Sequence, residues 1–123
     1  MSALLVVIGA AIGAPTRYLA DLWIQSRHET RWPWGTFAVN VAGSFVLGCV
    51  ASAVYAGSSP TWLLTLVGAG FCGALTTFST FSFEAVRLTQ EGALGTAVAY
   101  VAGSLAAGLA TCAAGWALVA ALT

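Results

Sequence analysis

Apolar positions run along the chain in four long blocks separated by short, more polar connections. The blocks cover residues 3–23, 35–55, 61–83 and 93–121, and the connections cover 24–34, 56–60 and 84–92. Each block supplies the roughly 20 apolar residues that an α-helix needs to cross a hydrocarbon core about 30 Å thick. The pattern predicts an all-α membrane protein with four transmembrane helices in a single domain, residues 1–123.

Composition supports a lipid environment. Hydrophobic residues make up 59% of the chain and charged residues only 7%, whereas charged residues form about a quarter of soluble domains. Cys49, Cys72 and Cys112 fall inside the blocks at spacings that fit neither a zinc site nor a disulfide framework. We expect them to be buried thiols, and membrane lipid to be the main partner of the surface.

Basic residues give a weak signal for orientation. Arg27 and Arg31 lie in the first connection and Arg87 in the third, while the amino end, the second connection and the carboxyl end have no Lys or Arg. The positive-inside rule then turns both termini outward, but so few charges also permit insertion in both orientations. Because four helices enclose little volume, we expect an antiparallel dimer with the working path between subunits.

Small residues four apart predict close helix contacts in lipid. They suit contacts within one chain as well as between copies, and they form the pairs Gly9 and Gly13, Ser44 and Gly48, and Ser104 and Gly108.

Residues 73–83 place five hydroxyl groups among three phenylalanines at membrane depth. β-Branched Thr76 and Thr77, following a glycine cluster, favour a break near the middle of the third helix. Such breaks survive in membranes only where neighbours or a cavity satisfy the backbone, and their exposed carbonyls attract cations. The alternative is an unbroken helix whose hydroxyls bond back to carbonyls one turn earlier.

Donors for an anion are also present. Phe78 and Phe81 share a helix face, and their ring edges are electropositive; Ser79 and Thr80 add hydroxyls. Asn40 is the only amide side chain within the four blocks, and its NH₂ group offers two donors. An interhelical hydrogen bond is the alternative role for Asn40.

Two further features have both a functional and a structural interpretation. Tyr100, Ser104, Gly108 and Thr111 form a narrow polar stripe on the last helix, which is either an ion track or a packing seam. Arg17, near the end of the first helix, either extends to lipid headgroups or attracts anions into a vestibule.

Catalytic chemistry is not indicated. The one histidine lies in a connection, no nucleophile has an evident base, and acidic residues sit at the ends of blocks. Glu84 and Arg87 are three apart and suit a local ion pair. We therefore expect neither an enzyme nor a nucleic-acid partner.

Three motifs together resemble the Fluc/CrcB fluoride channel family. They are Gly13-Ala14 followed by Arg17-Tyr18, the segment 35–48 with Asn40, and above all the segment 70–81. The resemblance implies a fluoride-selective channel that exports fluoride passively and so relieves fluoride toxicity. It also implies a multi-pass protein of the bacterial inner membrane.

The resemblance implies an antiparallel, dual-topology homodimer with two fluoride pores, although some organisms pair two oppositely oriented paralogues as a heterodimer. A structural, untransported sodium ion would be held at the dimer interface by the backbone carbonyls of Gly73 and Thr76. Pore roles would fall to Asn40, Phe78, Ser79, Thr80, Phe81, Tyr100 and Ser104, and a vestibule role to Arg17.

Two rival functions have discriminating tests. A small multidrug transporter also has four helices, but it needs a membrane-embedded carboxylate for proton exchange, and the first block has none before Asp21. In a purely structural assembly subunit the phenylalanines would be packing residues. Replacing Phe81 by isoleucine would then leave ion flux unchanged, whereas a channel would lose it.

Overall fold

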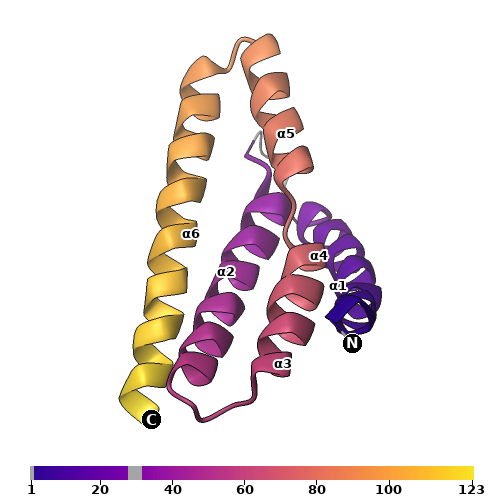
Figure 1. The fold of residues 1–123 in the computed structure, drawn as a ribbon. Helices are drawn as coiled ribbons and strands as arrows, with labels where there is room; N and C mark the ends of the chain where they lie inside the picture. Colours follow the sequence, from indigo (N-terminus) through magenta and orange to yellow (C-terminus); the bar gives the residue numbers. More distant parts are fainter. Residues whose placement is uncertain (1, 28–31) are drawn as a thin grey trace.

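The computed structural model describes residues 2–27 and 32–123, and the regular elements in these ranges are all helices. They are α1 (Ser2–Gln25), α2 (Trp34–Tyr55), α3 (Thr61–Leu63), η1 (Leu64–Cys72), α4 (Gly73–Leu75), α5 (Phe78–Gln90) and α6 (Leu94–Leu122). Figure 1 shows that α3, η1, α4 and α5 follow one another as a single interrupted span. Arg31 and the histidine of the first connection lie outside the described residues.

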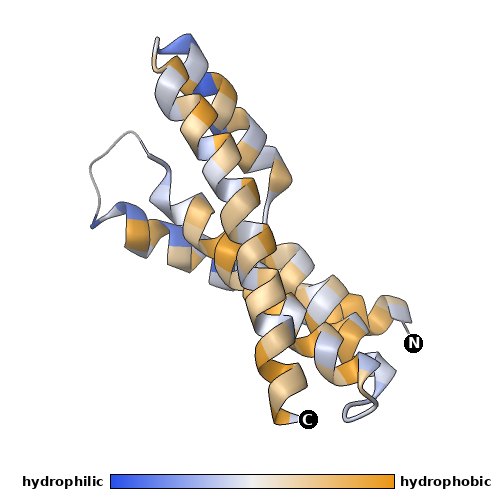
Figure 2. Cartoon of the chain, turned by 90° about the vertical axis from the view of Figure 1, so that its left-hand side faces the viewer, coloured by the Kyte–Doolittle hydropathy of each residue, from blue (hydrophilic) through white to orange (hydrophobic). Residues whose placement is uncertain are grey.

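Within the described residues, four helices are long and apolar enough to cross a membrane: Ser2–Gln25, Trp34–Tyr55, Thr61–Gln90 and Leu94–Leu122. Hydrophobic residues predominate along their length, and the most hydrophilic ones gather near helix ends (Figure 2). Many large apolar side chains are exposed. Leu109, in the interior of α6, is 74% exposed. Side chains of this kind need lipid or another protein around them, so the chain is a multi-pass membrane protein.

The third span is longer than the sequence pattern predicted. α5 continues to Gln90, so the helix does not end at residue 83 and the connection 84–92 shrinks to residues 91–93. The charged residues misled the prediction, because Glu84 is only 6% exposed and turns inward. Glu84 accepts a hydrogen bond from the Tyr100 hydroxyl at 3.3 Å, and its ion pair with Arg87 stays a prediction.

The predicted break in the third helix is confirmed. Thr76 has φ −80° and ψ 162°, and Thr77 has φ −150° and ψ 125°, so both are extended. Two extended residues in succession cannot continue the helical hydrogen-bond ladder, and the break at 76–77 lies near the middle of Thr61–Gln90. Branching at Cβ stiffens threonine and favours extended backbone, which agrees with the sequence argument.

Glycines allow the spans to pack backbone against backbone. A methyl group on Gly9 of α1 would overlap the Leu66 carbonyl oxygen of η1, and one on Gly48 of α2 would overlap the Cys112 carbonyl oxygen of α6. α2 and α6 lie side by side as a result (Figure 1). These small residues therefore serve contacts within one chain.

Candidate functional site

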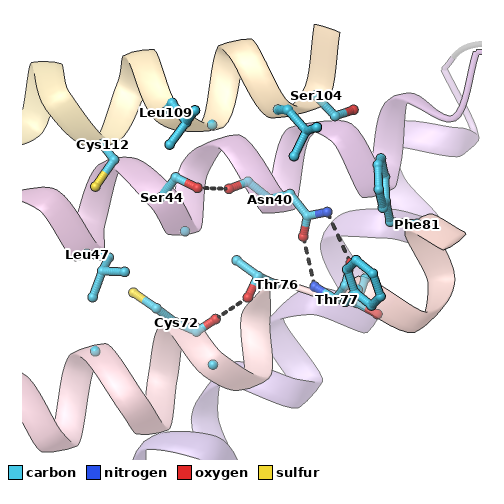
Figure 3. A pocket seen from close by; sticks show the side chains of 16 residues that line it. Asn40, Ser44, Leu47, Cys72, Thr76, Thr77, Phe81, Ser104, Leu109 and Cys112 are labelled. Atoms are coloured by element: carbon cyan, nitrogen blue, oxygen red, sulfur yellow. Dashed lines mark hydrogen bonds between the residues drawn. The ribbon is translucent and has the colours of Figure 1, made fainter. Parts of the chain in front are cut away.

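A groove of about 480 Å³ lies beside the helix break, with walls from α2, the η1–α4 segment, α5 and α6 (Figure 3). Its polar side chains are those of Asn40, Ser44, Thr76, Thr77 and Ser104, and the rest are glycines, aliphatic groups, phenylalanines and cysteines. Among the described residues, no charged side chain lines it. An ion in this groove would therefore meet neutral groups alone: amide and hydroxyl dipoles, phenylalanine rings and apolar side chains.

Asn40 closes the helix break from the neighbouring helix. Its Oδ1 accepts the Thr77 backbone N–H at 2.8 Å, and its Nδ2 donates to the Thr77 carbonyl oxygen at 3.1 Å (Figure 3). The Thr77 N–H that the break frees is thus paired, as buried backbone groups require, and the Thr77 carbonyl, which as the N-cap carbonyl also accepts from the first turn of α5, gains a second donor. The interhelical role is therefore present, and because the NH₂ group carries two hydrogens, one N–H remains for the groove.

Several carbonyls lose their usual helical donors at this point, among them those of Gly73 and Thr76. In an uninterrupted helix the Gly73 carbonyl would accept from Thr77 N–H and the Thr76 carbonyl from Thr80 N–H. Thr77 N–H instead bonds to Asn40, and Thr80 N–H bonds to the Thr77 hydroxyl at 3.2 Å. Oxygens freed in this way are the hard, neutral ligands that alkali and alkaline-earth cations accept, so Gly73 and Thr76 fit a cation site.

A cluster of hydroxyls caps the second half of the span. Thr77 Oγ1 accepts Thr80 N–H and so caps α5, and it donates to Thr80 Oγ1 at 3.1 Å. Ser79 Oγ lies 3.4 Å from Thr77 Oγ1. Ser79 is exposed and Thr80 half-buried, and neither lines the groove of the single chain. Their predicted pore role stays a prediction.

The two predicted aromatic residues lie together at the start of α5. The ring centroids of Phe78 and Phe81 are 6.1 Å apart with an interplanar angle of 45°, and both rings line the groove. Phe78 is 79% exposed, whereas Phe81 packs on Tyr100 at 5.1 Å. The pair therefore consists of the Phe81 ring, which is held against Tyr100, and the exposed Phe78 ring.

The polar stripe of the last helix is divided between two places. Ser104 and Gly108 line the groove, and Ser104 Oγ is buried without a hydrogen-bond partner. Tyr100 lies instead in a buried cluster with Leu88, 0% exposed, and outside the groove. Thr111 bonds back to the Ala107 carbonyl at 2.8 Å. Ser104 is therefore the stripe residue that lines the groove and has an unpaired hydroxyl, whose oxygen is covered in the single chain.

Arg17 lies in the interior of α1 and is half-buried. It does not line the groove, so the vestibule role stays a prediction.

The contacts of Thr77 at the site, and those of Glu84 outside it, were not predicted from the sequence. Thr77 provides both the peptide group held by Asn40 and the helix cap, and a threonine just before a helical segment is a recognised start signal. Glu84 gave no usable signal, because a carboxylate near the end of an apolar block is normally a surface residue.

Comparison with known proteins identifies the family. A family model described as "CrcB-like protein, Camphor Resistance (CrcB)" matches residues 4–116. The chain belongs to the CrcB family. The predicted family is thereby confirmed.

Curated members of the CrcB family are similar over most of this chain. A protein of Frankia casuarinae named "Fluoride-specific ion channel FluC 1" is 53% identical, covering 96% of this chain and 95% of its own length. A Streptomyces avermitilis protein of the same name is 52% identical, covering 89% and 88%. The Acidobacterium capsulatum protein "Fluoride-specific ion channel FluC" is 47% identical, also covering 89% and 88%.

Proposed function

We propose that this protein is a fluoride-selective ion channel that lets fluoride leave the cell passively and so limits fluoride toxicity. The observation that carries the proposal is the uncharged groove at the helix break, lined by amide and hydroxyl groups and two phenylalanine rings. The names of the related CrcB proteins support fluoride as the ion. A channel has no chemical step, in keeping with the absence of a predicted catalytic constellation.

Fluoride is small and strongly hydrated, so a path must replace its water with hydrogen-bond donors. The second N–H of Asn40 and the rings of Phe78 and Phe81, whose edges are electropositive, would serve as donors in the groove. The unpaired Ser104 hydroxyl, covered in the single chain, would have to turn towards the ion to join them. Because none of these groups carries full charge, each site is weak enough for the ion to move on. Ser79, Thr80 and Tyr100 would extend this path outside the single-chain groove.

A second copy would complete the path. Phe78 and Ser79 are exposed at the surface of one chain, at membrane depth, where an aromatic ring and a hydroxyl gain from a protein neighbour. We propose an antiparallel homodimer in the bacterial inner membrane, with a heterodimer of oppositely oriented paralogues as the alternative. The few arginines permit both insertions.

A sodium ion at the dimer interface would be held by the carbonyl oxygens of Gly73 and Thr76 together with those of a second copy. An added Cβ at Gly73 would meet no atom closer than 3.9 Å in one chain, so the approach to these carbonyls is open. The ion would neutralise carbonyl dipoles that the break leaves unpaired, and its charge would favour anions nearby.

One observation favours a second candidate, proton-coupled transport. Glu84 is a buried carboxyl group within the third span, and small multidrug transporters depend on such a group. Glu84 does not line the groove, however, and it is occupied by the Tyr100 hydroxyl. If a pH gradient alone drove uptake of a cationic dye into vesicles, this candidate would replace the channel.

The channel is tested by efflux from liposomes that contain the purified protein. Vesicles loaded with potassium fluoride receive valinomycin, and a selective electrode follows fluoride; chloride-loaded vesicles are the control. We expect rapid fluoride release and no chloride release. If neither fluoride nor chloride were released, and the same result were found after co-expression with an oppositely oriented paralogue, the proposal would be rejected.

A further inference from the structure

Thr77 makes hydrogen bonds at the break with its backbone N–H, its carbonyl and its hydroxyl. It is 9% exposed, and its peptide N–H and carbonyl are both bonded to Asn40. Its hydroxyl oxygen accepts Thr80 N–H at 3.2 Å, donates to Thr80 Oγ1 at 3.1 Å and lies 3.4 Å from Ser79 Oγ. All three polar groups of this residue therefore act on neighbours that the proposed path uses.

The hydrogens of the three hydroxyls can be assigned one by one. A hydroxyl has one hydrogen and two lone pairs. The Thr77 hydrogen goes to Thr80 Oγ1, and one Thr77 lone pair takes Thr80 N–H. A serine or threonine hydroxyl in a helix normally donates to the carbonyl one turn earlier. Thr80 Oγ1 makes no such bond within the described residues, so its hydrogen is free to point outward.

Accepting a hydrogen bond makes a hydroxyl a better donor, because chains of hydrogen bonds polarise one another in a low-dielectric site. Thr80 accepts from Thr77, so its own O–H is oriented and strengthened as a donor. The second lone pair of the Thr77 hydroxyl is left for the Ser79 hydrogen, across 3.4 Å. The geometry thus prepares the Thr80 hydroxyl as an outward-facing donor without placing Thr77 itself against an ion.

We propose that Thr77 is a positioning residue for the anion path: its hydroxyl turns the hydrogen of Thr80 towards the passing ion. The inference rests on the proposed fluoride channel and deepens it. Thr77 determines how well anions are recognised through Thr80, beyond any contribution to folding.

The test compares initial fluoride efflux per reconstituted protein for wild type, Thr77→Val, Thr77→Ala and Thr77→Ser. Loss of one charge-assisted hydrogen bond corresponds to about a tenfold change in rate, so we expect Val and Ala to slow fluoride about tenfold and Ser to restore it to within about twofold. Thr89→Val is the matched control, because Thr89 lies on α5, as Thr80 does, and its hydroxyl bonds only back to the Ala85 carbonyl oxygen, at 3.0 Å. Using both Val and Ala gives two ways to remove the hydroxyl if one variant fails to assemble.

A positioning role also predicts non-additivity. In a Thr80→Val background, adding Thr77→Val should change fluoride efflux less than twofold, because the donor that Thr77 orients is already gone. The inference would be overturned if Thr77→Val reduced fluoride efflux equally in both backgrounds, or if Thr77→Ser were as slow as Thr77→Ala. Wild-type efflux rates in Thr77→Val and Thr77→Ala would also overturn it. If Thr80→Val is too slow to measure, the rescue by serine decides. Silence of the wild type would instead refute the channel itself.

Discussion

Replacing Asn40 by leucine removes, with little change in volume, the side chain that pairs the broken backbone. The Thr77 N–H then loses its partner at 2.8 Å, and the Thr77 carbonyl loses its second donor at 3.1 Å but keeps the one from the first turn of α5. One orphaned buried group costs about 1–3 kcal/mol, so we expect the free energy of unfolding to fall by about 1–3 kcal/mol. Asn40→Asp keeps the acceptor but has a donor only when its carboxyl group is protonated. It should therefore be less damaging in the protonated form.

The assay is unfolding in mixed micelles with increasing dodecyl sulfate, followed by tryptophan fluorescence. Thr16→Val is the control, because the Thr16 hydroxyl bonds to the Ile12 carbonyl at 2.6 Å in an exposed turn of α1. That carbonyl remains within the helical ladder after the substitution, so we expect a change below about 0.5 kcal/mol. If Asn40→Leu lost no more stability than Thr16→Val, the clamp would not hold the break together.

Three further predictions follow from packing, the rings and the cation site. Gly48→Ala places a methyl group against the Cys112 carbonyl and should sharply reduce the folded protein recovered from membranes. In the control Gly95→Ala the added Cβ meets no atom within 4 Å, so this variant should be neutral or slightly stabilising. Equal recovery of the two variants would contradict the close α2–α6 contact. Phe78→Ile and Phe81→Ile should each slow fluoride efflux at least about tenfold. Only Phe81→Ile should lower the unfolding temperature, because Phe78 is 79% exposed. Unchanged efflux in both variants would favour a structural subunit. Replacing sodium by N-methylglucamine should lower the unfolding temperature of the dimer, as loss of a bound ion does, and an unchanged temperature would argue against the cation site.

Much of the fold was predictable because lipid imposes simple constraints. Four apolar blocks give four spans, and glycines followed by Thr76 and Thr77 indicate a break. The third span was misjudged at its end because a charged residue was taken as the membrane boundary. Glu84 is instead buried beside Tyr100, a contact between residues 16 apart that periodicity does not reveal.

The candidate site was predictable in its residue types but not in its connections. Asn40 was identified as an isolated donor, but its partner Thr77 lies 37 residues away and becomes a neighbour only through packing of α2 against the break. Tyr100 and Ser104 share a helical stripe, yet one turn of helix separates the buried cluster from the groove. Local spacing determines which residues share a face and leaves open what that face meets.

The central claim is most directly tested by current through a planar bilayer containing only this protein, with unequal fluoride concentrations and equal chloride on the two sides. A passive fluoride channel predicts that the current reverses at the equilibrium potential of fluoride. Reversal near zero or at the potassium potential, or no current at protein densities that give fluoride efflux from vesicles, would contradict it.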